Sequence, residues 1–213
     1  MAAPFDLSLY LVTDAGLAGP RGVVETVRAA VAGGITLVQL RDPAAKGRAQ
    51  VETAAALLEI LRPLGIPLII NDRVDVALAV GADGVHVGQS DIPAAMVREM
   101  IGPDRILGLS VSYASELAAP DLGFVDYLGV GPIYATPTKT NAAPPIGFDG
   151  LAALAAASPL PVVAIGGVKQ EHVEPILAAG AAGVAIVSAI MAADDPAAAA
   201  ADFSARIRRF RSG

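Results

Sequence analysis

The chain has 213 residues, of which 54% are apolar, and it carries a net charge of −6 with no cysteine and two histidines. The absence of cysteine excludes disulfides, thiolate nucleophiles and Cys-ligated metal centres, and the negative charge disfavours binding to nucleic acid. Because the longest uncharged apolar run near the C-terminus covers only residues 181–193 and the start lacks a secretory pattern, we expect no membrane insertion and a cytoplasmic location.

Short apolar runs alternate with Ala- and Leu-rich stretches of helical spacing along the chain, which indicates a βαβα protein. The predicted strands cover residues 9–13, 37–40, 68–70, 84–87, 106–109, 127–130, 162–165 and 183–187. The predicted helices cover residues 21–32, 48–62, 73–80, 93–101, 115–119, 149–157, 171–179 and 196–210. Eight strands with helical crossovers predict an α/β fold, a (β/α)8 TIM barrel that forms a single domain over residues 1–213. The first turn lacks the glycine pattern of a dinucleotide site.

Polar residues follow most of the predicted strands. In a parallel barrel the carboxyl ends of the strands and the loops after them form the active site, so these residues are expected to meet at one end. They include Gln39, Arg41, Asp42, Asn71, Asp72, His86, Asp91 and Ser110, followed by Thr136, Thr138 and Lys139 in a long loop after the sixth strand. For His86 we expect a structural role in the barrel rather than duty as a general base.

Asp72 and Asp91 follow neighbouring predicted strands, so their carboxylates are candidates to share a hard cation. Mg2+ suits them, because it is usually held by one or two carboxylates together with water and substrate phosphate oxygens. The alternative is that both aspartates only cap the helices after them. The other polar groups at the same end of the barrel favour the metal site.

Candidate phosphate partners come from two regions. Arg41 stands at a strand end and Lys139 in the long loop, where they offer a planar fork and a compact charge to phosphate oxygens. Gly166 and Gly167 after the seventh strand, with Ser188 after the eighth, predict a phosphate cup of the kind found in many barrels. A glycine turn without a ligand is the alternative reading.

Seven segments in chain order carry a family resemblance. They read LYLVTD at residues 9–14, GITLVQLR at 34–41, IINDR at 69–73, ADGVHVGQ at 82–89, GPIYATPTK at 131–139, AIGGV at 164–168 and VSAI at 187–190. Together they resemble thiamine phosphate synthase. The resemblance implies condensation of an aminopyrimidine methyl diphosphate with a (carboxy)thiazole phosphate, giving thiamine phosphate and pyrophosphate with Mg2+ as cofactor.

The resemblance also implies a role for each matching residue. The pyrimidine diphosphate would be bound by Gln39, Leu40, Arg41, Asp42, Pro43, Asn71, Ser110 and Lys139. The thiazole phosphate would be bound by Thr136, Pro137, Thr138, Gly167, Val187 and Ser188. Asp72 and Asp91 would hold Mg2+, and Arg41, Ser110 and Lys139 would be the catalytic residues. No protein nucleophile is required, because positioning replaces it.

One position departs from the family pattern. The family often has Gln-x-Arg-Glu-Lys where this chain has Pro43 in place of the lysine, so either Lys46 reaches back or Arg41 and Lys139 suffice. Three other readings stay open: a thiazole tautomerase, a non-catalytic protein that binds a phosphorylated ligand, and an unrelated aldolase or isomerase barrel. Apolar faces on the outer helices would permit a homodimer.

Overall fold

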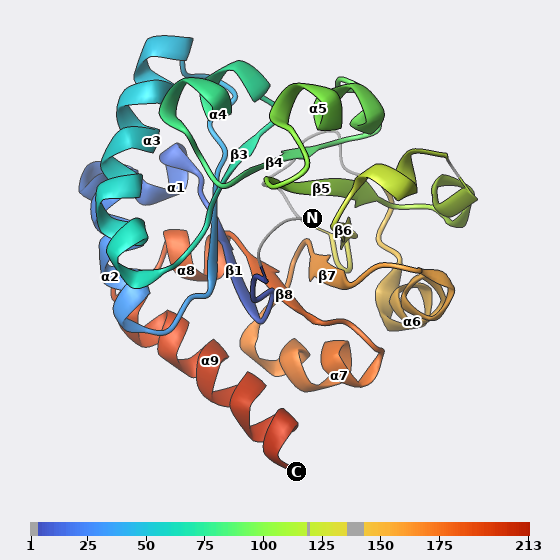
Figure 1. The fold of residues 1–213 in the computed structure, drawn as a ribbon. Coiled ribbons are helices and arrows are strands. Elements are labelled where there is room, and N and C mark those ends of the chain that lie inside the picture. Colours follow the sequence, from blue (N-terminus) through green and yellow to red (C-terminus); the bar gives the residue numbers. More distant parts are fainter. Residues whose placement is uncertain (1–3, 119, 136–142) are drawn as a thin grey trace.

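Eight parallel strands form a closed barrel in the computed structural model, which describes residues 4–118, 120–135 and 143–213. The strands are β1 (Leu9–Val12), β2 (Leu37–Leu40), β3 (Leu68–Asn71), β4 (Gly84–Val87), β5 (Ile106–Val111), β6 (Tyr127–Val130), β7 (Val162–Ile165) and β8 (Gly183–Ile186). Each strand pairs with the next, and β8 returns to pair with β1 (Figure 1). The predicted (β/α)8 barrel is confirmed, and four of the eight predicted strands match residue for residue.

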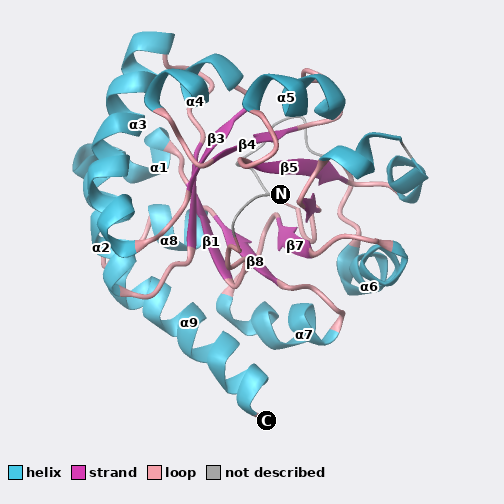
Figure 2. Ribbon diagram, viewed as in Figure 1, coloured by secondary structure: helices cyan, strands magenta, loops and turns pink. Residues whose placement is uncertain are grey.

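Helices surround the barrel, as Figure 2 shows. They are α1 (Ala15–Ala18), α2 (Gly22–Ala32), α3 (Gly47–Leu61), α4 (Val74–Val80), α5 (Ala94–Ile101), α6 (Gly147–Ala157), α7 (Val173–Ala178), α8 (Ser188–Met191) and α9 (Pro196–Ser212). Seven of the predicted helices are confirmed, with ends that shift by at most two residues. Within the described ranges, no helix is long and apolar enough to cross a membrane.

The fifth predicted helix, at residues 115–119, is wrong. Two short 3-10 segments occupy this region instead, η3 (Ala114–Ala118) and η4 (Pro120–Phe124). Pro120 explains the difference, because a proline lacks the backbone donor that a continuing helix needs. The four-residue helices α1 and α8 were not predicted, since they are too short to show a helical period.

Side chains alternate between two cores along every strand, because successive residues of a strand point to opposite faces. The outward residues pack against the helices in one large cluster, which includes Leu11, Val38 and Ile70. The inward residues form a smaller cluster inside the barrel, with Tyr10 and Tyr127 as its largest members. The inward residue nearest the carboxyl end of each strand therefore faces the active-site end.

Closure of the barrel between β8 and β1 requires a glycine at position 183. A Cβ atom there would lie 1.9 Å from the backbone oxygen of Leu7, which no side-chain rotation relieves. We expect Gly183→Ala to lower the free energy of unfolding by about 1–3 kcal/mol, the usual cost of forcing an extra methyl group into a packed site. Urea denaturation measures the change.

Gly123→Ala is the matched control, because nothing lies within 4 Å of the Cβ position at Gly123. Its effect should stay within about 0.5 kcal/mol. Equal stability of the two variants would show that the contact at Leu7 does not constrain closure.

Candidate active site

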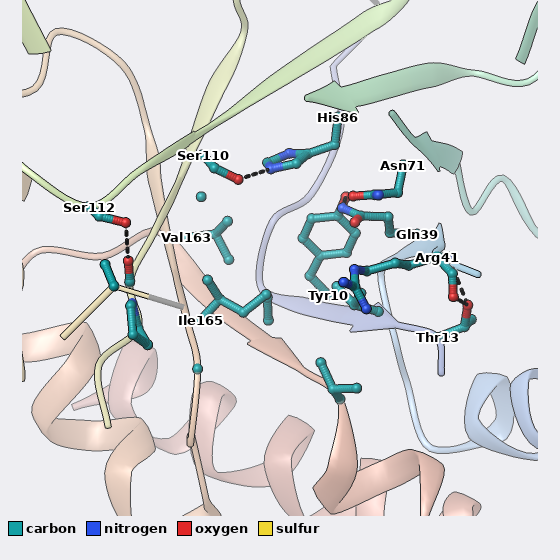
Figure 3. Close-up of a pocket in the computed structure, with 18 residues that line it drawn as sticks. Tyr10, Thr13, Gln39, Arg41, Asn71, His86, Ser110, Ser112, Val163 and Ile165 are labelled. Carbon is teal, nitrogen blue, oxygen red and sulfur yellow. Dashed lines mark hydrogen bonds between the residues drawn. The ribbon is translucent and has the colours of Figure 1, made fainter. Parts of the chain in front are cut away.

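A pocket opens at the carboxyl ends of the strands, with about 940 Å3 of empty space when the part open to solvent is counted. Its polar lining comes from Tyr10, Thr13, Gln39, Arg41, Asn71, His86, Ser110 and Ser112, and its apolar side from residues that include Val12, Val163, Ile165, Ala185 and Val187. Figure 3 shows Val163 and Ile165 on one side and Gln39, Arg41 and Asn71 on the other. The pocket thus offers an apolar wall opposite hydrogen-bonding groups.

Five of the predicted substrate-binding residues line this pocket: Gln39, Arg41, Asn71, Ser110 and Val187. They come from β2, β3 and β5 and from the turns after β2 and β8, so residues up to about 150 positions apart in the chain meet here. The closure of the barrel brings them together, because all strand ends point the same way.

The other predicted substrate-binding residues are not part of the described lining. Leu40 points outward into the helix-facing core and is 3% exposed. Asp42 accepts a hydrogen bond from the backbone of Ala45 at 3.2 Å, and Pro43 beside it is exposed. Gly167 and Ser188 adjoin lining residues without being among them. The remaining predicted residues, Thr136, Pro137, Thr138 and Lys139, lie outside the described residues.

The Arg41 backbone is fixed by the end of β1. Its amide donates to Thr13 Oγ1 at 3.0 Å, and the same hydroxyl donates to the Arg41 carbonyl at 3.4 Å. This pair of bonds positions the turn after β2 against β1. The guanidinium is a lining group of the pocket, where its planar fork suits a phosphate or a carboxylate.

The two predicted metal ligands lie together. Asp91 is within hydrogen-bonding reach of Asp72, and Asn71 Nδ2 donates to Asp72 Oδ2 at 2.6 Å. Asp91 Oδ2 in turn accepts from the backbone amide of Gly88 at 2.7 Å. The residue Asp72 has a positive φ of 60°, a conformation that only a few residue types besides glycine adopt readily. The Asp72 carboxyl group thus lies beside Asp91 on a backbone in the left-handed region.

The proximity of the two carboxyl groups has an electrostatic cost. Asp72 as a whole is exposed, but its carboxyl group is partly removed from water, and this desolvation together with the charge of Asp91 raises its pKa from 3.8 to about 6. Arg41 lowers the pKa, although its effect is smaller. A cation between the two carboxylates would relieve the repulsion. Within the described residues no group of three or more His, Cys, Asp or Glu side chains could hold a metal, so this pair is the candidate.

The glycines after β7 pack against the segment that follows β6. A Cβ at Gly166 would lie 2.5 Å from Pro132 Cβ, and a Cβ at Gly167 would lie 2.6 Å from Tyr134 Cβ. Both glycines also have positive φ, at 96° and 65°. Packing alone therefore requires the glycine pair, and the pair brings the chain after β7 close to the start of the long loop.

A chain of hydrogen bonds forms the floor of the pocket, and sequence reasoning missed most of it. Gln39 Nε2 donates to the Tyr10 hydroxyl at 2.7 Å, which lies 2.8 Å from the Tyr127 hydroxyl. His86 Nδ1 is 2.9 Å from that hydroxyl, and its Nε2 is 2.9 Å from Ser110 Oγ. His86 is a buried strand residue inside the barrel, as expected. The period-two alternation of β1 and β6 is the signal that could have found the two tyrosines.

Comparisons with known proteins agree on one family. A sequence model described as "Thiamine monophosphate synthase" matches residues 9–190. "Thiamine-phosphate synthase" of Azorhizobium caulinodans is 60% identical over 195 residues, covering 92% of each chain, and that of Xanthobacter autotrophicus is 58% identical over 207 residues, covering 97% of this chain and 98% of the relative. The solved structure of "Thiamine phosphate pyrophosphorylase from Pyrococcus furiosus" has a TM-score of 0.86 at 36% identity and covers 96% of both chains. The chain belongs to the thiamine phosphate synthase family of transferases.

Proposed function

We propose that the enzyme joins 4-amino-2-methyl-5-(diphosphooxymethyl)pyrimidine to a (carboxy)thiazole phosphate, giving thiamine phosphate and pyrophosphate. CO2 is a further product where the thiazole carries the carboxylate. The observation that carries the proposal is a pocket lined by a polar floor and Arg41, beside which the Asp72–Asp91 pair is joined to the lining residue Asn71 by a hydrogen bond and interacts with Arg41. Such a pocket suits a flat polar ring attached to a diphosphate that requires a cation.

The pyrimidine would lie on the floor of the pocket. Gln39, Asn71 and Ser110 supply amide and hydroxyl groups from three strands, and the apolar wall of Val163 and Ile165 offers a face for the ring. Groups on strands hold their positions better than groups on loops, which favours recognition of a rigid ring. Arg41, at the strand end, would bind the diphosphate, joined by Lys139 from the long loop.

Mg2+ fits the acid pair. Two carboxylates are a sufficient protein contribution, since Mg2+ keeps several waters and takes substrate phosphate oxygens as its other ligands. Asp72 and Asp91 would hold the ion, and Asn71 orients Asp72 by its hydrogen bond. When bound, Mg2+ neutralises charge on the pyrophosphate leaving group. The chain's own contribution to that step is the positive charge of Arg41 and Lys139.

The thiazole phosphate would lie on the other side of the mouth. Its proposed partners are Thr136, Pro137, Thr138, Gly167, Val187 and Ser188. Of these, Val187 lines the pocket, and Ser188 is the first residue of α8. Binding both substrates side by side replaces a bimolecular encounter by an oriented attack of the thiazole nitrogen on the exocyclic carbon. This assignment needs no protein nucleophile.

Pro43 leaves the usual lysine position without a charge. Lys46, the nearest lysine in sequence, precedes α3 and is exposed, whereas Arg41 lines the pocket. We therefore assign the main diphosphate contact before β3 to Arg41. A thiazole tautomerase or a non-catalytic binder is not favoured, because the curated relatives at 58–60% identity are named thiamine-phosphate synthases.

Substrate turnover tests the proposal directly. Purified protein supplied with both substrates should release pyrophosphate and form thiamine phosphate only when Mg2+ is present, because the leaving group needs its charge neutralised. A coupled phosphatase assay measures pyrophosphate, and chromatography measures thiamine phosphate. Binding of thiazole phosphate without product formation at saturating Mg2+ would refute the proposal and leave a binding or tautomerase role.

Asp72→Asn tests the metal site. Asparagine tolerates the positive φ of this position better than alanine does, so the variant isolates the lost charge. We expect kcat to fall on the order of 100-fold, since metal stabilisation of a leaving group is worth several kcal/mol. Thiazole phosphate binding, measured by calorimetry, should not change.

Asp195→Asn is the control for Asp72→Asn. Asp195 caps α9 by accepting a hydrogen bond from the Ala198 amide at 3.0 Å, and asparagine caps a helix about equally well. This variant should keep the wild-type kcat. If Asp72→Asn also kept the wild-type kcat and the same dependence on Mg2+, the metal would not lie at Asp72.

Removal of metal by a chelator should reveal how much the charge of Asp72 lowers the stability of the fold. Its folded pKa of about 6 lies above its ordinary value of 3.8, so ionisation destabilises the metal-free fold as the pH rises from about 4 through 6. In EDTA, Asp72→Asn should match the wild type near pH 4 and be more stable by up to about 1 kcal/mol at about pH 7.5, a small value because the residue is exposed. Thermal unfolding across this range measures the difference. A wild type that is equally stable at the higher pH would contradict the expectation.

A further inference from the structure

The hydrogen-bond chain in the barrel floor connects the two sides of the pyrimidine site. Its ends, Gln39 on β2 and Ser110 on β5, line the pocket. Its middle member, Tyr127 on β6, is 0% exposed and is not among the pocket-lining residues, so it lies beneath the floor. Tyr10 joins Tyr127 to Gln39, and His86 joins it to Ser110. Tyr127 therefore stands in the middle of this chain of hydrogen bonds and connects its two ends.

Two inward-facing glycines make room for this arrangement. A Cβ at Gly108 would lie 2.2 Å from Tyr127 Cζ and 2.4 Å from His86 Nδ1, and a Cβ at Gly129 would lie 3.0 Å from His86 Cε1. Gly108 is paired with His86 on one side and with Tyr127 on the other. The missing side chain of Gly108 lets Tyr127 reach His86 across β5. A glycine inside a strand commonly marks such a close approach.

The direction of donation along this chain of hydrogen bonds follows from counting the protons of its members. Gln39 donates to Tyr10, and each tyrosine hydroxyl carries one proton. The contacts of the Tyr127 hydroxyl with Tyr10 and with His86 each allow either partner to donate, and the donation from Gln39 to Tyr10 selects one order, in which Tyr10 donates to Tyr127 and Tyr127 donates to His86 Nδ1. A neutral imidazole that accepts at Nδ1 carries its proton on Nε2, which donates to Ser110 Oγ.

This direction of donation decides which end of the pocket floor offers a donor to a ligand and which end offers an acceptor. Ser110 accepts from His86, so its own proton is directed away from His86 and is available to an acceptor in the pocket. Gln39 turns Nε2 toward Tyr10, which leaves Oε1 as an acceptor for a ligand. One donor and one acceptor at opposite ends of the floor match an aminopyrimidine, which has ring nitrogens that accept and an amino group that donates.

We propose that Tyr127 is a positioning residue that, through Tyr10 and His86, fixes Gln39 as an acceptor and Ser110 as a donor for the aminopyrimidine ring. The inference deepens the proposed function and rests on it. Tyr127 touches no substrate, because its hydroxyl is used by Tyr10 and His86 below the floor. It acts only by orienting the two residues that do.

The burial of Tyr10 and Tyr127 supports a fixed direction of donation along the chain of hydrogen bonds. Desolvation raises the pKa of both Tyr10 and Tyr127 above the ordinary value of 10, so both hydroxyls keep their protons at neutral pH. Within the described residues, no buried side-chain nitrogen or oxygen is without a hydrogen-bond partner. A satisfied network of buried polar groups holds its members in one arrangement, since any change of direction leaves a group unpaired.

The tautomer of His86 gives a test that needs no substrate. The chain has only two histidines, so 15N imidazole NMR shows two ring systems, and His172→Gln assigns the signal that remains to His86. In the wild type we expect His86 to be protonated at Nε2. Tyr127→Phe removes the donor to Nδ1, so the single tautomer should be lost. Tyr10→Phe leaves that donor in place, and the tautomer should persist. A wild-type His86 protonated at Nδ1 would overturn the direction and with it the proposal.

Kinetics tests the positioning role. Tyr127→Phe should raise the KM for the pyrimidine diphosphate about tenfold, the effect of one lost hydrogen bond, and should leave the KM for thiazole phosphate unchanged. Tyr10→Phe should also raise the pyrimidine KM, because it frees Gln39. The double variant should be no worse than the more affected single variant, as for residues that act as one unit.

Tyr113→Phe is the matched control, because Tyr113 is 50% exposed and lies outside the chain of hydrogen bonds. It should change neither KM. If Tyr127→Phe lowers the melting temperature but leaves both KM values unchanged, the network is only structural and the proposal is wrong. If Tyr127→Phe does not fold, the tautomer of His86 in the wild type decides, because protonation at Nδ1 would still overturn the proposal. A wild type without turnover would refute the proposed function instead, and the tautomer measurement would still report the direction of the chain.

Discussion

The closure of eight short parallel strands around a narrow interior is the constraint on which this structure depends. Alternation along each strand sends half of its residues outward to the helices and half inward, so a four-residue strand has only two inward positions. The lower inward layer is filled by residues such as Leu37 and Ile69. The upper inward layer lines the pocket, and there β2, β3 and β4 place Gln39, Asn71 and His86.

The narrow interior also explains why the packing of the two tyrosines and the pairing of their hydroxyl groups depend on the same few residues. Two tyrosines inside one small barrel need space, which glycines at positions 108 and 129 provide. Their hydroxyls also need partners, because an unpaired polar group in the interior is costly. Tyr10 and Tyr127 satisfy each other and extend to Gln39 and His86. The large side chains that fill the barrel therefore also join the residues that line the pocket.

The sequence predicted the barrel well because apolar runs bounded by glycine and polar residues mark strands that are buried on both sides. It also placed Gln39, Asn71 and Ser110 at the pocket end of the barrel, since the direction of the parallel strands alone decides which end these residues occupy. It did not separate inward from outward positions, which is why Leu40 was grouped with its neighbours although it points into the outer core. Tyr127 was missed for a related reason: it stands at the start of its strand, below the floor, where sequence gives no sign of a partner from β1 or β4.

The site divides into two parts with different physics. The floor is built from neutral groups on strands, and the hydrogen bonds that join these groups to one another form without any ligand. The rim carries charges that follow the strands, Arg41, Asp72 and Asp91, and there desolvation together with the charge of Asp91 raises the pKa of Asp72. Preformed neutral groups suit recognition of a ring, because they lose little entropy on binding. An unrelieved pair of carboxylates suits capture of a cation, because the ion removes an existing penalty as it binds. Under the proposed function, the part of the site that reads the pyrimidine is ready before substrate arrives, and the part that neutralises its diphosphate is completed by the metal.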